Sequence, residues 1–226
     1  MTTIATSAVA PGLTSHRVGM FTDAVFAIAM TLLVIELPKP ARNTDGADRM
    51  AMASELWRFL GDNAGSFLAF VVAFLMLWAA WRQHHAVFDQ LDRVTPAIMF
   101  LHIPLLILVV LLPYPTALVG ESLAGELVDN PLSICLFAGT EALLLLCQAA
   151  LLSVVVHSGV LKPGSDDRPL RIKAIMLAAF GLFWALTAVL TWWFSKVPVV
   201  WLLSPVVATG SSKLADRLLP KASSPT

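Results

Sequence analysis

The sequence predicts an all-α, polytopic membrane protein with six transmembrane helices, and three observations indicate this fold class. Hydrophobic residues make up 58% of the 226-residue chain and charged residues only 13%, against about 45–50% and about 25% in a typical soluble domain. Apolar stretches recur at close to the roughly 20 residues that a helix needs to cross the hydrocarbon core. No stretch alternates apolar and polar residues as a half-buried strand does.

The charge balance and the apolar pattern set the domain organisation. Fifteen basic residues balance fifteen acidic ones, so net charge does not favour a nucleic-acid partner. We interpret 17–218 as one transmembrane domain, and we expect the Ser-, Thr-, Ala- and Pro-rich tails 1–16 and 219–226 to be disordered. The expected spans are 18–37, 57–82, 95–112, 131–156, 172–194 and 197–214.

The first span is expected to be a retained helix. Its apolar run follows Arg17, continues for about 18 residues and ends at Pro38 without a small-residue cleavage site, unlike a signal peptide. Neither glycine nor proline occurs between Met20 and Leu37, so the helix should be unbroken, with every carbonyl bonded within its own backbone. No TVGYG-like loop occurs in the chain, so any ion selection along this helix must come from side chains.

The third and sixth spans contain proline. We expect the third helix to stop at Pro113-Tyr114-Pro115, because proline removes a backbone donor, and a short acidic loop to follow it. That loop would hold Glu121, Glu126 and Asp129. The sixth span is the least regular, since it contains Pro198 and Pro205.

The distribution of basic residues predicts the orientation. With the N-terminus inside, the inner segments hold ten Lys and Arg residues and the outer segments five. Basic residues prefer the cytoplasmic side, so both termini should be cytoplasmic in a cell membrane. The inner residues are Arg17, Arg82, Arg93, Lys162, Arg168, Arg171, Lys173, Lys213, Arg217 and Lys221, and the outer ones are Lys39, Arg42, Arg49, Arg58 and Lys196.

The first helix separates its aliphatic residues from its carboxylate. At 100° per residue, Ile28, Leu32 and Ile35 share one arc of about 100° with the hydroxyl of Thr31. Asp23 lies almost on the opposite face. On periodicity alone, such an aliphatic stripe usually indicates helix packing. A carboxylate inside an apolar span is costly unless it is paired, so Asp23 is either a structural ion-pairing group or a functional one.

The motif on this helix resembles the signature of a known family. Arg17-x-x-x-Phe21-Thr22-Asp23, followed by the apolar run 24–37, is similar to the Arg-x-x-x-Phe-Ser-Asp signature of the transmembrane-protein-175 family of potassium channels, in particular its bacterial branch. Thr22 stands where the family has serine and keeps the hydroxyl. The second helix agrees through Ser66-Phe67 and Trp81-Arg82-Gln83-His84-His85-x-x-Phe88, and the third through Leu111-Leu112-Pro113-Tyr114-Pro115-Thr116.

The resemblance covers 17–120 and implies a homotetramer in which the first helix lines a central pore for potassium ions. It implies that rings of Ile28, Leu32 and Ile35, with Thr31 adjacent, form an aliphatic constriction that gates by dewetting. It also implies a mainly structural role for a network whose members are Arg17, Phe21, Thr22, Asp23, Trp81, His84 and His85. Asp23 would meet Trp81, His84 or His85, because the start of the first helix and the end of the second share the cytoplasmic face.

Other polar residues carry weaker signals. The histidines, among them His102 and His157, show no metal-ligand spacing, so we expect neither a metal nor another cofactor. Glu36 either raises the cation concentration at a pore mouth or lies in a solvated loop. Glu141 lies in mid-membrane, with Gln148 on the same face, and has no evident partner.

Two functions remain open, and an enzyme is not expected because no catalytic constellation or extramembrane domain occurs. The first is a potassium-selective channel. The alternative is a proton-coupled secondary transporter that uses Asp23 or Glu141, although transporters commonly have broken helices around a midplane site.

Overall fold

A computed structural model describes residues 15–40, 48–124 and 130–219, and the regular structure in these ranges is helical. The elements are α1 Ser15–Ile35, α2 Arg49–Asp62, α3 Ala64–Phe88, α4 Pro96–Leu111, α5 Pro113–Ala124, α6 Pro131–His157, α7 Arg168–Leu190, α8 Val197–Val200, the 3₁₀ turn η1 Trp201–Leu203 and α9 Ser204–Leu218. Ser15 and His16, expected in the disordered tail, form the first turn of α1. The rest of the two predicted tails, apart from Leu219, lies outside the described residues.

Six stretches of the described chain are long and apolar enough to cross a membrane, which confirms the predicted number of spans. They are Ser15–Ile35, Ala64–Phe88, Pro96–Leu123, Pro131–His157, Arg168–Leu190 and Val197–Leu218. The protein is therefore a multi-pass membrane protein.

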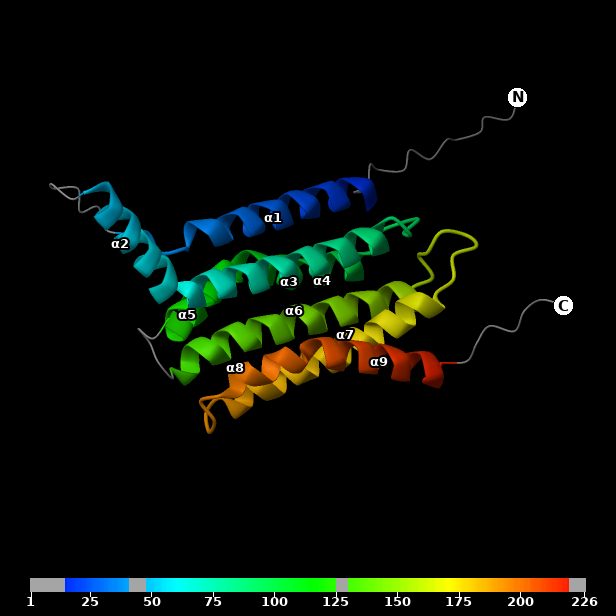
Figure 1. Cartoon of the computed structure of the whole chain (residues 1–226). Helices are drawn as coiled ribbons and strands as arrows, with labels where there is room; N and C mark the ends of the chain where they lie inside the picture. Colours follow the sequence, from blue (N-terminus) through cyan, green and yellow to red (C-terminus); the bar gives the residue numbers. More distant parts are fainter. Residues whose placement is uncertain (1–14, 41–47, 125–129, 220–226) are drawn as a thin grey trace, which may run out of the picture.

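The second span begins later than predicted. Trp57 belongs to α2, a separate helix with no buried residue that lies at an angle across the end of the bundle (Figure 1). The chain bends at Asn63, where φ is −102° and ψ is 16°. Both the backbone N–H and the side-chain amide of Asn63 donate to the carbonyl of Phe59, at 3.0 and 2.8 Å. This local capping ends α2 before α3 begins.

The third helix does not stop at Pro113, which corrects the prediction. The chain continues as α5, and Leu112 keeps helical angles of −55° and −35°. The carbonyl of Leu112 accepts both the backbone N–H of Thr116, at 3.1 Å, and its hydroxyl, at 2.7 Å. The backbone bond resumes the helical ladder directly after Pro113 and Pro115, which have no N–H to donate. Glu121 therefore lies on a helix instead of in a loop, whereas Glu126 and Asp129 lie outside the described residues.

The helices form a bundle with α6 in its interior, α1 at one edge, and α7 and α9 at the opposite edge (Figure 1). The α6–α7 pair packs closely, since a Cβ added at Gly181 would lie 2.9 Å from Cγ of Leu146. The loop after α3 and the loop after α6 pair at one end, where the backbone N–H of Asp92 donates to the carbonyl of Val160 at 2.9 Å. The first turn of α1 and the last turn of α9 lie at this same end (Figure 1).

Candidate functional site

The face of α1 that points away from the bundle carries most of the predicted aliphatic stripe. Ile28 is 57% exposed and Ile35 59% exposed, and Thr31 is also exposed, while Leu32 is half-buried at the edge of this face. The opposite face is buried against α3, α4 and α5, and its members are Val18, Thr22, Phe26, Ala29 and Leu33. We call Ile28, Thr31, Leu32 and Ile35 the outward stripe.

The backbone of α1 is continuous from Ser15 to Ile35. The Thr31 hydroxyl donates to the carbonyl of Ile28 at 2.8 Å. A hydroxyl has one proton and two lone pairs, so the exposed Thr31 oxygen still has acceptor capacity toward whatever passes along the outward stripe.

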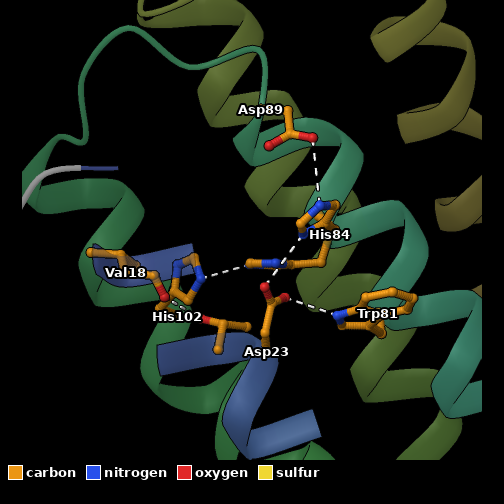
Figure 2. Close-up of polar contacts among 8 residues, drawn as sticks. Val18, Asp23, Trp81, His84, Asp89 and His102 are labelled. Atoms are coloured by element: carbon orange, nitrogen blue, oxygen red, sulfur yellow. Dashed lines mark hydrogen bonds and ion pairs between the residues drawn. The ribbon is translucent and has the colours of Figure 1, made fainter. Parts of the chain in front are cut away.

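Asp23 lies between α1 and α3 and joins the two helices (Figure 2). Trp81 donates its indole N–H to Oδ1 of Asp23 at 2.8 Å, and Nδ1 of His85 lies 3.4 Å from Oδ2. His85 also lies 3.6 Å from the carboxylate of Asp89, one turn further on. The structure thus brings Asp23 to Trp81 and His85, two of its three predicted partners.

The remaining motif residues lie around this network. Thr22 is buried, and its hydroxyl donates to the carbonyl of Val18 at 2.9 Å (Figure 2). Arg17 and Phe21 are exposed on the outward side of α1. The side chain of Thr22 thus bonds within its own helix, while Asp23 provides the link between helices.

His84 does not reach Asp23 and instead pairs with His102 on α4, a contact that the sequence did not indicate. Their Nε2 atoms lie 2.7 Å apart, and both rings are buried (Figure 2). Because a carbonyl can only accept, Nδ1 of His102 donates to Ile98 at 3.2 Å. In the neutral rings, His84 must therefore donate from Nε2 to the bare Nε2 of His102. Phe88 stacks on His84 with ring centroids 4.3 Å apart.

A detectable signal for this pair exists. The segment between α3 and α4 is short, so α3 runs toward the turn and α4 away from it, and residues at similar distances from the turn lie at similar depth. His84 precedes the end of α3 by four residues, and His102 follows the start of α4 by six. Together, Asp23, Trp81, His85, His84 and His102 connect α1, α3 and α4 at one end of the bundle.

The other end of α1 opens on a second polar region. Glu36 is exposed just beyond α1 and lines a cavity of about 400 Å³ together with Asp62 and Glu121. The wall of the same cavity also contains the basic side chain of Lys39, so it carries three acidic residues and one basic residue. No group of three or more His, Cys, Asp or Glu residues that could hold a metal ion occurs among the described residues.

Residues 17–113 match the model of a family described as endosomal/lysosomal potassium channel TMEM175. The resemblance to the TMEM175 family is confirmed. The chain is 39% identical over 112 residues to a potassium channel of Streptomyces collinus, and 35% identical over 108 residues to one of Chamaesiphon minutus. These matches cover 50% and 47% of this chain, and the chain spans about half the length of each of these relatives.

Solved TMEM175 structures share the fold across nearly the whole chain. A lysosomal potassium-selective channel TMEM175 homolog from Chamaesiphon minutus superposes with a TM-score of 0.66 at 22% identity, covering 90% of this chain and 96% of the other. A variant of the potassium channel MtTMEM175, in complex with a Nanobody-MBP fusion protein, gives 0.63 at 16% identity and covers 96% and 98%. The six-span architecture is therefore that of TMEM175 channels.

Proposed function

We propose that the protein is a potassium channel of the cell membrane whose pore forms between four copies of the chain. The observation that carries this proposal is the outward stripe on an unbroken α1, in a chain whose named relatives are potassium channels. Around a fourfold axis, the stripe of one copy would face the same stripe on the others, and the axis would be the ion path.

The position of α1 supports a pore between copies. α1 lies at the edge of the bundle, and Ile28, Thr31 and Ile35 of its outward stripe are exposed among the described residues (Figure 1). Its buried face, by contrast, packs against α3, α4 and α5. A pore-lining helix needs one face on its own subunit and another on the axis, which is how α1 is divided.

The chemistry of the outward stripe sets how such a pore would work. Ile28, Leu32 and Ile35 would form rings of aliphatic side chains, and a hydrophobic constriction can gate by losing its water. The Thr31 oxygen would offer lone pairs to a hydrated cation one turn from the Ile28 and Ile35 rings. Glu36 would raise the cation concentration at the outer mouth.

The orientation follows from the same arrangement. The basic inner segments would place the start of α1 and the end of α9 in the cytoplasm, together with the Asp23 network. Asp23, Trp81 and His85 would then hold α1 against α3 on the side away from the axis. Their role would be to orient the outward stripe and to leave ion contact to its side chains.

Reconstitution tests the proposed function. Purified protein in planar bilayers, with KCl on one side and NaCl on the other, should carry ohmic current that reverses near the potassium equilibrium potential. Native mass spectrometry in mild detergent should give four copies of the 24.4 kDa chain. Transport that saturates at low turnover and requires a proton gradient would favour the transporter instead. Against that reading, Asp23 is already bonded to Trp81 and α1 is unbroken.

The constriction has its own test. Ile28→Ala should widen a ring and change single-channel conductance or the potassium-to-sodium permeability ratio. Val34→Ala is the matched control, because Val34 is also exposed on α1 but lies about 120° away from Ile28 around the helix. Equal effects of the two substitutions would contradict a constriction at the outward stripe.

A further inference from the structure

A large cavity lies on the side of the bundle away from α1. It has a volume of about 780 Å³ and is lined by residues of α3, α5, α6, α7 and the segment from α8 to α9. Binding sites for small organic molecules commonly measure about 300–1,000 Å³ and are mostly apolar with a few polar groups. This cavity has the same character, because aliphatic and aromatic side chains form most of its wall.

Four aromatic side chains converge on the cavity wall. The ring centroids of Trp184 and Trp201 lie 5.0 Å apart, and that of Phe137 lies 5.4 Å from Trp201 and 5.9 Å from Trp184. Phe180 completes the group, 6.3 Å from Trp184. All four residues line the cavity. The faces of aromatic rings carry negative potential and attract organic cations.

A buried acid lies beside these rings. Glu141 lines the same cavity, one helical turn from Phe137 on α6, and is only 1% exposed. Its Oε1 atom has no hydrogen-bond partner among the described residues, nor has the indole nitrogen of Trp184. An unpaired acid at mid-membrane depth is costly, and such residues mark functional sites by default.

Nothing in the described part of the wall compensates this acid. No Lys, Arg or His lines the cavity. Gln148, two turns along α6, donates its amide to the carbonyl of Ala80 at 3.1 Å and is thereby engaged with α3. A complementary ligand would supply the positive charge that the wall lacks.

We propose that this cavity binds a hydrophobic organic cation, an amine with an alkyl or aryl tail that enters from the lipid. The ammonium group would lie against Glu141 and the aromatic faces, and the tail would follow the aliphatic wall of α3 and α7. A neutral lipid chain would fill the same volume but would gain nothing from Glu141. This proposal does not depend on the proposed channel function.

Photolabelling in lipid nanodiscs tests the proposal. A dodecylamine analogue with a diazirine on its chain should label α3 or α7, as mapped by peptide mass spectrometry. Unlabelled dodecylamine should displace it at least tenfold more effectively than dodecanol or dodecanoic acid. In Glu141→Gln, the ratio of displacement by dodecylamine to displacement by dodecanol should fall to about one. Glu55→Gln, which changes an exposed acid on α2 outside the cavity, should leave it unchanged.

Three results would overturn the proposal. One is equal displacement by dodecanol and dodecylamine in the unaltered protein, which would indicate a site for any lipid chain and needs no variant. The others are labelling confined to α1 and an amine advantage that survives Glu141→Gln. Should Glu141→Gln prevent folding, Trp201→Leu provides the second variant, and it should weaken dodecylamine displacement more than dodecanol displacement.

Discussion

Replacing Asp23 tests whether the α1–α3 contact orients the helix. The side chain of Asp23 is 34% exposed and accepts the indole N–H of Trp81 at 2.8 Å. A hydrogen bond to a charged group contributes roughly 1.5–3 kcal/mol. The His85 contact, at 3.4 Å and half exposed, adds about 0–1 kcal/mol, as surface ion pairs do. Asp23→Ala should therefore destabilise the protein by about 2 kcal/mol.

The loss should be visible as a shift in thermal stability. For a soluble chain of about this length, 1 kcal/mol lowers the Tm by roughly 2–4 °C, so Asp23→Ala should lower it by about 4–8 °C on that scale. The Tm of Asp23→Asn should lie between those of the unaltered protein and Asp23→Ala, because asparagine keeps the acceptor oxygen but loses the charge. The assay is size-exclusion chromatography of detergent-solubilised protein after heating, with the yield of the assembled peak measured at each temperature.

Asp89→Asn is the matched control. Asp89 also faces His85, at 3.6 Å, but is 70% exposed and bonds within its own helix, so its loss should change the Tm little. A double-mutant cycle between Asp23→Ala and Trp81→Phe isolates the contact itself, because each substitution removes one partner of the hydrogen bond. Additive effects in that cycle, or an unchanged Tm for Asp23→Ala, would refute the reasoning.

Two further substitutions test packing elsewhere. His84→Phe should cost roughly 1–3 kcal/mol, because it leaves Nε2 of His102 buried without a donor, and the double variant with His102→Phe should cost less than the sum of the singles; additive Tm shifts would contradict the pairing. Gly120→Ala would place a Cβ 2.9 Å from Cα of Ser66 and should cost about 1–3 kcal/mol. A Cβ added at Gly139 would meet no neighbouring atom of the described residues within 4 Å, so Gly139→Ala should be neutral or stabilise the protein by up to about 1 kcal/mol. Similar Tm values for Gly120→Ala and Gly139→Ala would argue against the close approach of α5 to α3.

The sequence carried much of the fold and the division of α1 into faces. Helical periodicity alone separated Ile28 and Ile35 from Asp23, and the structure finds the two isoleucines exposed and Asp23 directed toward α3. That contact was predictable because hairpin topology places the start of the first helix beside the end of the second. The number of spans was equally predictable from the sequence, since each span is long and apolar.

Helix ends were harder to predict from the sequence, for physical reasons. The break at Asn63 falls in the short turn-forming stretch 61–66, but apolar residues resume on both sides of it, so the apolar profile alone joins α2 to α3. Pro113 is a usual helix stop in water, but here Leu112 keeps helical angles and its carbonyl accepts the backbone N–H of Thr116, so the chain stays helical. The His84–His102 pair also requires that the two rings face each other across the bundle, which the spacing of the two residues from the turn does not report.

The outward stripe also has a consequence for how single copies of the chain would associate in the membrane. In a newly inserted copy, Ile28 and Ile35 would be exposed to the lipid. Thr31 would be exposed as well, but its proton is already bonded within its helix. Acyl chains solvate such a surface well, so an unpartnered copy is tolerated and leaves no polar path through the membrane. If copies assemble as proposed, their association would gain little from hydrophobic burial and would rest on side-chain packing. The number of assembled units should therefore fall steeply when the protein is diluted in lipid, and conduction should fall with it.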